Sequence, residues 1–400
     1  MTLDTGFKRL PVFAGASILS LLLLAGWYLD DGSHEGRLLG LSLVLGGTFG
    51  WVLQRSRFCF FCISREYLEE RDGRGLLGLV AALAVGLVGY HAVFGAFLPE
   101  PVAGRLPPGA HIGPVSYVLA LAALVFGIGM SVSGSCISAH LYRVGEGSIA
   151  SLAALVGALL GFILGFLSWN GLYLSVIQAS PVIWLPHSLG YAGSLLLQLA
   201  VLAVIAWWLS RGALPVPDQA TPGAVRSLPE RLLRSRWPVW CGGLLVAFIG
   251  TIAYLRVAPL GVTAELGSIA RTLATGQGWL PERLHGLDGF RGCATVIKES
   301  LLSNNGVFIA ALVLASFGSA LIAGDFRPRW PGVAEAVRNL SGGILMGWGA
   351  MVGLGCTVGT LLSGIMAGAL SGWLFALFCF VGLWLGLKGR RRFEAISTKA

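Results

Sequence analysis

The amino-acid sequence predicts an all-α protein that crosses a membrane about ten times. The mean hydropathy is +0.77, and only 12% of the 400 residues are charged. A chain of this kind has too little polar surface to cover a water-soluble domain. Its 58 glycines suit helices that pack closely or break within a lipid bilayer. We therefore expect a polytopic helical membrane protein with a few short re-entrant helices.

Apolar stretches of roughly 17 to 22 residues, the length that spans a bilayer as a helix, locate the individual spans. The first, Pro11–Leu29, follows Lys8 and Arg9, and no Ala-x-Ala-like cleavage site comes after it. We expect it to be a span and not a cleaved signal. The predicted spans are residues 11–29, 37–54, 75–98, 115–136, 148–168, 189–210, 238–258, 306–324, 339–361 and 369–388.

The basic residues, which give a formal net charge of +9, fall mostly in loops on one side of these spans. By the positive-inside rule that side is the cytoplasm, where both termini are then also expected. We predict a multi-pass protein of a bacterial inner membrane, in contact with lipid and not with nucleic acid. Its predicted parts are a first membrane half (1–210), a cytoplasmic linker (211–237) and a second membrane half (238–400).

Two glycine-flanked cysteines interrupt apolar stretches near the expected middle of the bilayer. Each unit begins with Gly-x-Gly, at Gly127 or Gly347, and reaches its cysteine, Cys136 or Cys356, nine residues later. By the count of spans, the segment with Cys136 runs toward the cytoplasm and the segment with Cys356 runs away from it. We therefore predict two halves related as an inverted-topology repeat, which is typical of transporters that bind their substrate between the halves.

Two connections are longer than a compact helical bundle needs. Residues 54–75 combine arginines and aromatic residues with Cys59 and Cys62. Residues 260–306 contain an amphipathic stretch, Thr263–Leu273, and then Phe290–Cys293. We expect both connections to fold back into the membrane as short helices that line a path.

The two cysteine units have the composition of an anion-binding site. Glycine, serine and threonine expose backbone N–H groups, and a helix that restarts there has a partially positive N-terminus. A thiol adds a weak donor and a polarisable surface, which suits a sulfur-bearing anion better than an anion with oxygen alone. The candidate binding residues in these units are Gly134, Ser135, Cys136, Gly355, Cys356 and Thr357.

Segments in both halves carry the motifs of one family. They are Gln54–Cys59 with Ser64–Glu66, Gly134–Cys136 with Tyr142–Gly147, and Gly355–Thr357 with Ser363–Ile365 and Trp373. Together they resemble the YeeE/YedE family of sulfur-transport membrane proteins, whose characterised members take up thiosulfate. The resemblance implies that Cys59, Cys136 and Cys356 line a narrow path and pass thiosulfate along by S–H···S contacts. It also implies a small cytoplasmic TusA-like sulfur-carrier protein as a partner.

The chain departs from that family beside the first midplane cysteine. Ser135 stands where the family often has glycine, and the bulkier His140 follows Cys136. The identity of the anion, thiosulfate or a related sulfur or selenium anion, is therefore open at this point.

Arg57 and Arg65, in the connection after the second span, are expected to balance the charge of the anion on the cytoplasmic side. Arg143 and Glu146 are interpreted as an ion pair at a helix start. No Walker motif, dinucleotide fingerprint or HExxH sequence occurs. We therefore predict a carrier and not an enzyme, with no catalytic residue, cofactor or metal ion.

Two other functions stay open at the level of sequence. Cys59 and Cys62 have CxxC spacing, so a membrane thiol-disulfide oxidoreductase that works with a quinone is one alternative. A structural subunit of a sulfur-metabolism membrane complex is the other. We expect all seven cysteines to be free thiols. No role in the carrier is assigned to Cys62, Cys241, Cys293 or Cys379.

Overall fold

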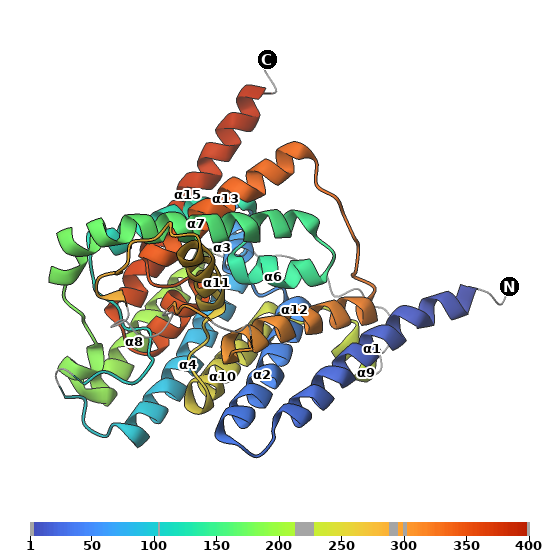
Figure 1. Cartoon of the computed structure of the whole chain (residues 1–400), viewed down its shortest axis with the longest axis horizontal. Helices are drawn as coiled ribbons and strands as arrows, with labels where there is room; N and C mark the ends of the chain where they lie inside the picture. The colour runs from blue at the N-terminus through green and yellow to red at the C-terminus, as the bar shows by residue number, and fades with distance from the viewer. Residues whose placement is uncertain (1–3, 103–104, 213–227, 288–294, 299–301, 398–400) are drawn as a thin grey trace.

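The protein is a bundle of long apolar helices (Figure 1). The computed structural model describes residues 4–102, 105–212, 228–287, 295–298 and 302–397. Within these residues, nine helices are long and apolar enough to cross a membrane, and a tenth crossing is formed if one bent helix pair counts as a single span. Each of the ten predicted spans falls on one of them, so the prediction of a polytopic helical membrane protein is confirmed.

The described elements follow one another with short connections in most places. In chain order they are α1 (Asp4–Leu29), α2 (His34–Ser56), α3 (Phe60–Glu70), α4 (Arg74–Phe97), α5 (Tyr117–Ser133), α6 (Ile137–Gly145), α7 (Ile149–Ser175), η1 (Ile177–Ala179), α8 (Leu185–Gly212), α9 (Leu228–Leu233), α10 (Val239–Arg256), α11 (Val262–Gly276), α12 (Asn304–Ala323), α13 (Val333–Val352), the π-helix η3 (Thr357–Ser363), α14 (Gly364–Met366) and α15 (Leu370–Ser397).

Three helices break and restart after a few residues, and each break has a residue with positive φ. Arg57 (φ 51°) separates α2 from α3, and Gly134 (φ 80°) separates α5 from α6. Gly355 (φ 149°) separates α13 from η3, where the helix pair bends by 43°. A positive φ cannot continue a right-handed helix, so the chain must turn at these points. A π-helix inside a helical segment is itself common at functional sites.

Helices α7 and α13 are held together by glycines at four-residue spacing. A Cβ at Gly157 or Gly161 of α7 would lie 2.2 or 2.1 Å from a carbonyl oxygen of α13. A Cβ at Gly343 or Gly347 of α13 would lie 2.1 Å from a carbonyl oxygen of α7. Small residues on both helices therefore let the two backbones touch, as is common in membrane bundles. This contact fixes α13, the helix that leads into the break at Cys356.

The two cysteine units have the same order of elements. In the first, α5 breaks before α6, and a turn with Gly147 (φ 94°) leads into the long helix α7. In the second, α13 breaks before η3 and α14, and a turn with Gly368 (φ 76°) leads into the long helix α15. The local repeat in the sequence is thus a repeat of local structure. The opposite orientation of the two halves stays a prediction.

Both long connections contain a helix. Phe60–Glu70 forms α3, which buries Phe61, Ile63, Ser64 and Tyr67. The amphipathic stretch predicted at Thr263–Leu273 forms α11, whose first seven residues are all buried and which contacts α6, α7 and η3. It therefore lies between the helices that follow Cys136 and Cys356. The stretch Phe290–Cys293 lies outside the described residues.

The last residues of the predicted linker are fixed to the first half of the chain. Arg236 donates from Nη1 to the Gln54 carbonyl at 2.6 Å, and the Trp237 N–H donates to the Arg55 carbonyl at 3.1 Å. The end of the linker is thus held to α2 by hydrogen bonds, although Arg236 itself is exposed. The division of the chain into halves at 211–237 stays a prediction.

Candidate functional site

All three cysteines of the family motifs occupy the same kind of position, the residue directly before a restarted helix. Cys59 precedes α3, Cys136 precedes α6 and Cys356 precedes η3, each with an extended backbone. The carbonyl of each cysteine accepts the first hydrogen bond of the new helix, from Ile63, His140 and Thr360 respectively. These local folds follow from the positive-φ residues that end the preceding helices.

This position gives each thiol the electrostatic surroundings expected of an anion site. The first N–H groups of a helix have no carbonyl partner within the helix, and the helix dipole makes that end partially positive. Gly134 and Ser135 lie between α5 and α6, Gly355 precedes Cys356, and Thr357 is the first residue of η3; their role in binding an anion stays a prediction. The side chains of the three cysteines are only 1 to 2% exposed, so they point into the protein interior and not toward lipid.

The structure brings Cys59 and Cys136 together although 77 residues separate them in the chain. Their sulfur atoms are 3.6 Å apart, a distance at which one thiol donates to the other. Ser135 Oγ lies 3.9 Å from Cys59 Sγ, and Ser138 Oγ lies 3.3 Å from Cys136 Sγ. The site therefore consists of two thiols surrounded by hydroxyl groups. All six described cysteines are free thiols.

Cys356 has different surroundings. Within the described residues its thiol makes no hydrogen bond with Cys59 or Cys136. Cys356 lies in the break between α13 and η3. The Thr360 hydroxyl spans this break, because it donates to the Leu354 carbonyl at 3.1 Å. A small cleft beside this break is lined by Gly353, Leu354 and Thr360, together with His111 and Ser116 from the segment before α5. Cys356 is thus close to an opening that the Cys59 and Cys136 pair does not share.

The two arginines predicted to balance the anion do not contact a thiol. The Arg57 side chain is exposed. Arg65 forms an ion pair with Glu69 at 3.7 Å, one turn along the same helix, and its guanidinium lies 5.8 Å from the centre of the Phe61 ring. Their roles stay predictions, since neither residue is placed against Cys59 or Cys136.

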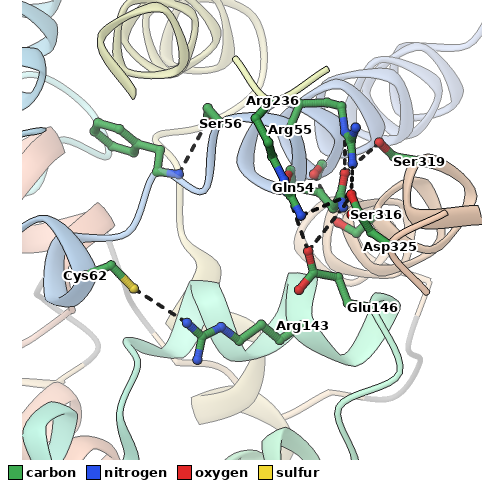
Figure 2. A network of polar contacts seen from close by, with 12 residues as sticks. Gln54, Arg55, Ser56, Cys62, Arg143, Glu146, Arg236, Ser316, Ser319 and Asp325 are labelled. Atoms are coloured by element: carbon green, nitrogen blue, oxygen red, sulfur yellow. Dashed lines mark hydrogen bonds and ion pairs between the residues drawn. The ribbon is translucent and has the colours of Figure 1, made fainter. Parts of the chain in front are cut away.

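The arginine that does reach a thiol is Arg143, for which the sequence predicts a pair with Glu146 (Figure 2). Its Nη2 lies 3.5 Å from Cys62 Sγ, and its Nη1 donates to the Gly134 carbonyl at 3.3 Å. The interpretation as a pair with Glu146 is wrong, because Glu146 contacts Gln54 and Arg236 instead. One sequence signal could have found Arg143: it follows Cys136 by seven residues, two helical turns, and so lies on the same face of α6.

His140 is fixed by hydroxyl groups. Its two ring nitrogens each lie 3.2 Å from a hydroxyl, Nδ1 from Ser151 and Nε2 from Ser133. Ser133 in turn donates to the Ser135 carbonyl at 3.1 Å. The imidazole is thus hydrogen-bonded to residues on both sides of Cys136, and among the described residues it makes no hydrogen bond with the thiol.

A separate cluster of charges lies where α2, α6, α12 and the linker end meet (Figure 2). Buried Arg55 pairs with Asp325, and Arg236 pairs with Asp325 at 3.0 Å and with Glu146 at 3.9 Å. Gln54 also donates to Glu146 and Asp325, at 3.1 and 3.2 Å. Burial alone would raise the pKa of Asp325, but Arg236 and the hydrogen bonds from Arg55 and Gln54 hold it below its ordinary value of 3.8. The two arginines and two carboxylates neutralise one another.

The described residues contain no group of three His, Cys, Asp or Glu side chains that could hold a metal ion.

Comparison with known proteins gives one consistent result. The sequence model of the sulphur transport family matches residues 55–385. The thiosulfate transporter TsuA of Escherichia coli (strain K12) is 26% identical over 374 residues, covering 86% of this chain and 92% of the relative. The thiosulfate transporter TsuA of Spirochaeta thermophila is 28% identical over 353 residues, covering 86% and 96%. The probable transporter YedE of Salmonella typhimurium is 23% identical over 198 residues, about half of each chain.

Proposed function

This chain belongs to the sulphur transport family, and we propose that it carries thiosulfate, or a closely related anion with a terminal sulfur, across a bacterial inner membrane. The direction of transport is toward the cytoplasm, where both chain termini lie. Two relatives that align over most of their length are named thiosulfate transporters, which supports this substrate. The chain is a transporter and not an enzyme.

The observation that carries the proposal is the contact between the Cys59 and Cys136 thiols, 3.6 Å apart at the starts of two helices. Thiosulfate has two chemically different ends. Its terminal sulfur is soft and accepts S–H donors, whereas its oxygens accept N–H and O–H donors. Thiols beside helix N-termini and serine hydroxyls supply both kinds of donor without a buried carboxylate that would repel the anion.

The residues have different roles along the path. Cys356, close to the cleft that Gly353, Leu354 and Thr360 line, receives the anion first. Cys136 and Cys59 then bind it with the amides that follow Gly134 and Ser135. Arg57 and Arg65 attract it toward the cytoplasm, where a TusA-like sulfur-carrier protein is a plausible acceptor by family resemblance. Gly355 and Thr357 supply the amides beside Cys356.

Uptake of labelled thiosulfate by a bacterial strain that lacks its own thiosulfate carrier tests the proposal. Expression of this chain should restore uptake, and unlabelled thiosulfate should compete much better than sulfate, sulfite or selenite, because these lack the terminal sulfur. The variant Cys241→Ala changes a half-buried thiol of α10 outside the site and serves as the control. Competition by sulfate equal to that by thiosulfate would contradict the proposal.

Alkylation distinguishes this carrier from a thiol-disulfide oxidoreductase. A carrier works with every thiol free, as the described cysteines are, so labelling before and after reduction should modify the same cysteines. An oxidoreductase would instead contain a Cys59–Cys62 bond that reduction opens.

A further inference from the structure

Arg143 is the basic side chain that lies among the thiols without a carboxylate partner in the described part of the chain. None of the ion pairs there includes it. Its guanidinium contacts weak or neutral acceptors, which are the Cys62 sulfur, the Gly134 carbonyl and the Tyr142 hydroxyl. Charged residues in membrane segments are normally paired, and an unpaired one marks an ion or substrate path.

The neighbouring charged cluster shows that the other arginines of this region do have carboxylate partners. Arg55 and Arg236 lie close by, and each pairs with a carboxylate (Figure 2). Glu146 is three residues from Arg143 on the chain, yet its carboxylate faces Gln54 and Arg236. Asp325 and Glu146 thus pair with Arg55 and Arg236, and among the described residues the positive charge of Arg143 is left for a ligand.

The arginine and the thiols are arranged along two adjoining helix starts. Helix α3 begins after Cys59 and carries Cys62 one turn later, and α6 begins after Cys136 and carries Arg143 two turns later. Two contacts join them: Cys59 meets Cys136, and Cys62 meets Arg143. The site therefore has a sulfur end and a guanidinium end. Cys59 and Cys136 are buried, whereas Cys62 and Arg143 are partly exposed, so the guanidinium end is the more accessible one.

We propose that Arg143 binds the oxygen end of the anion whose sulfur end contacts Cys59 and Cys136, and that Cys62 is the contact of Arg143 between transport events. This inference rests on the proposed function and assigns its specificity-determining residue. A planar guanidinium presents paired N–H donors that match the oxygens of a sulfonate-like group. A thiol is a weak acceptor, so Cys62 gives up the guanidinium readily when an oxyanion arrives. An anion with one hard and one soft end satisfies both parts of the site.

A carboxylate at position 62 provides the sharpest test, because it would keep Arg143 occupied. We expect Cys62→Asp to raise the KM for thiosulfate by about ten-fold to a hundred-fold, the range of a charge-assisted hydrogen bond. The matched variant Cys62→Asn has nearly the same shape without the charge and should stay near the wild type. Both leave the Arg143 contact with Gly134 available, so a difference between them cannot arise from loss of that structural contact.

Substitution of the arginine gives the complementary measurement. Arg143→Gln should raise the KM by a similar factor, and Arg143→Lys, which keeps the charge but not the paired donors, should lie between Gln and the wild type. The control is Arg329→Gln, which removes an exposed arginine that pairs with Glu335. Initial rates are measured with the purified full chain in liposomes, and equal melting temperatures identify the variants that are folded.

Calorimetric titration of thiosulfate into the detergent-solubilised protein separates this inference from the proposed function. If wild-type liposomes transport thiosulfate while Arg143→Gln and Cys62→Asp keep its KM and binding affinity, the assignment of Arg143 is overturned and the function stands. If the wild type binds thiosulfate through Arg143 and does not transport it, the binding site stands and the transport proposal fails. If the wild type neither binds nor transports thiosulfate, both are overturned.

Discussion

The breaks at Cys136 and Cys356 share a local structure and differ in what surrounds them. Each is a cysteine that follows positive-φ glycine and precedes a short helix. At Cys136 a second thiol, two serine hydroxyls and an arginine are close by. At Cys356 the break is closed by Thr360, with a small cleft beside it. One motif therefore produces two sites with different electrostatics, because their neighbours come from different parts of the chain.

This difference suggests a division of roles along the transport path. The neutral break at Cys356 suits passage, since an anion held only by amides and one thiol is released easily. The break at Cys136 suits binding, since charge and several donors meet there. The following predictions test that contrast in order of decreasing effect.

Oxidation should have the largest effect. Copper phenanthroline with oxygen removes two electrons and two protons from the Cys59 and Cys136 thiols, which are already in contact, and joins them by one S–S bond. We expect uptake to stop and to return with dithiothreitol, and peptide mass spectrometry to identify the bond. Cys59→Ser is the control, whose remaining uptake should not respond to the oxidant. A bond from Cys59 to Cys356 as the main product would contradict the separation of the two breaks.

Replacing the thiols one at a time should separate binding from passage. Cys136→Ala and Cys356→Ala should each lower uptake at low thiosulfate by about ten-fold or more, because a donor to an anion is lost. In Cys136→Ala the change should appear mainly in KM, and in Cys356→Ala mainly in the maximal rate. Concentration series of labelled thiosulfate measure both constants. The same change in both variants would show that the two breaks do not differ in role.

The second break should also depend on the contact between α7 and α13. A Cβ at Gly347 would lie 2.1 Å from the Ala158 carbonyl oxygen, so Gly347→Ala forces the helices apart. We expect a loss of about 1–3 kcal/mol in the free energy of unfolding, as for other overpacked positions. Gly332→Ala is the matched control, because nothing lies within 4 Å of its Cβ position. Thermal unfolding in detergent measures the difference, and equal stabilities would refute the tight contact.

The smallest effect is expected in the charged cluster near the first break. Because the pKa of Asp325 is lowered in the folded protein, its ion pairs stabilise the fold at pH above its ordinary value of 3.8. That contribution is lost as the pH falls through the lowered pKa. Asp325→Asn should therefore reduce the melting temperature slightly at pH 7, and the difference should shrink on acidification. A difference in melting temperature that grows at low pH would contradict this prediction.

Much of the architecture could be predicted because it depends on composition and local sequence. Long apolar stretches gave the spans, and glycines with their cysteines marked two of the three breaks. The helix α11 followed from an amphipathic stretch, and its re-entry into the membrane stays a prediction. Local sequence could not show which arginine lies closest to the thiols. Arg57 and Arg65 were chosen because they lie near Cys59 in sequence, but Arg143 reaches the thiols from another helix.

The sequence by itself determined that this chain crosses a membrane many times and where two of its three helix breaks lie, because hydropathy and backbone freedom are properties of neighbouring residues. Only the tertiary structure decided which thiols meet and which cation stays without an acid. Cys59 and Cys136 are 77 residues apart, and the acids that pair with Arg55 and Arg236 come from α6 and from beyond α12. Contacts of that kind depend on how helices pack, which no single segment specifies.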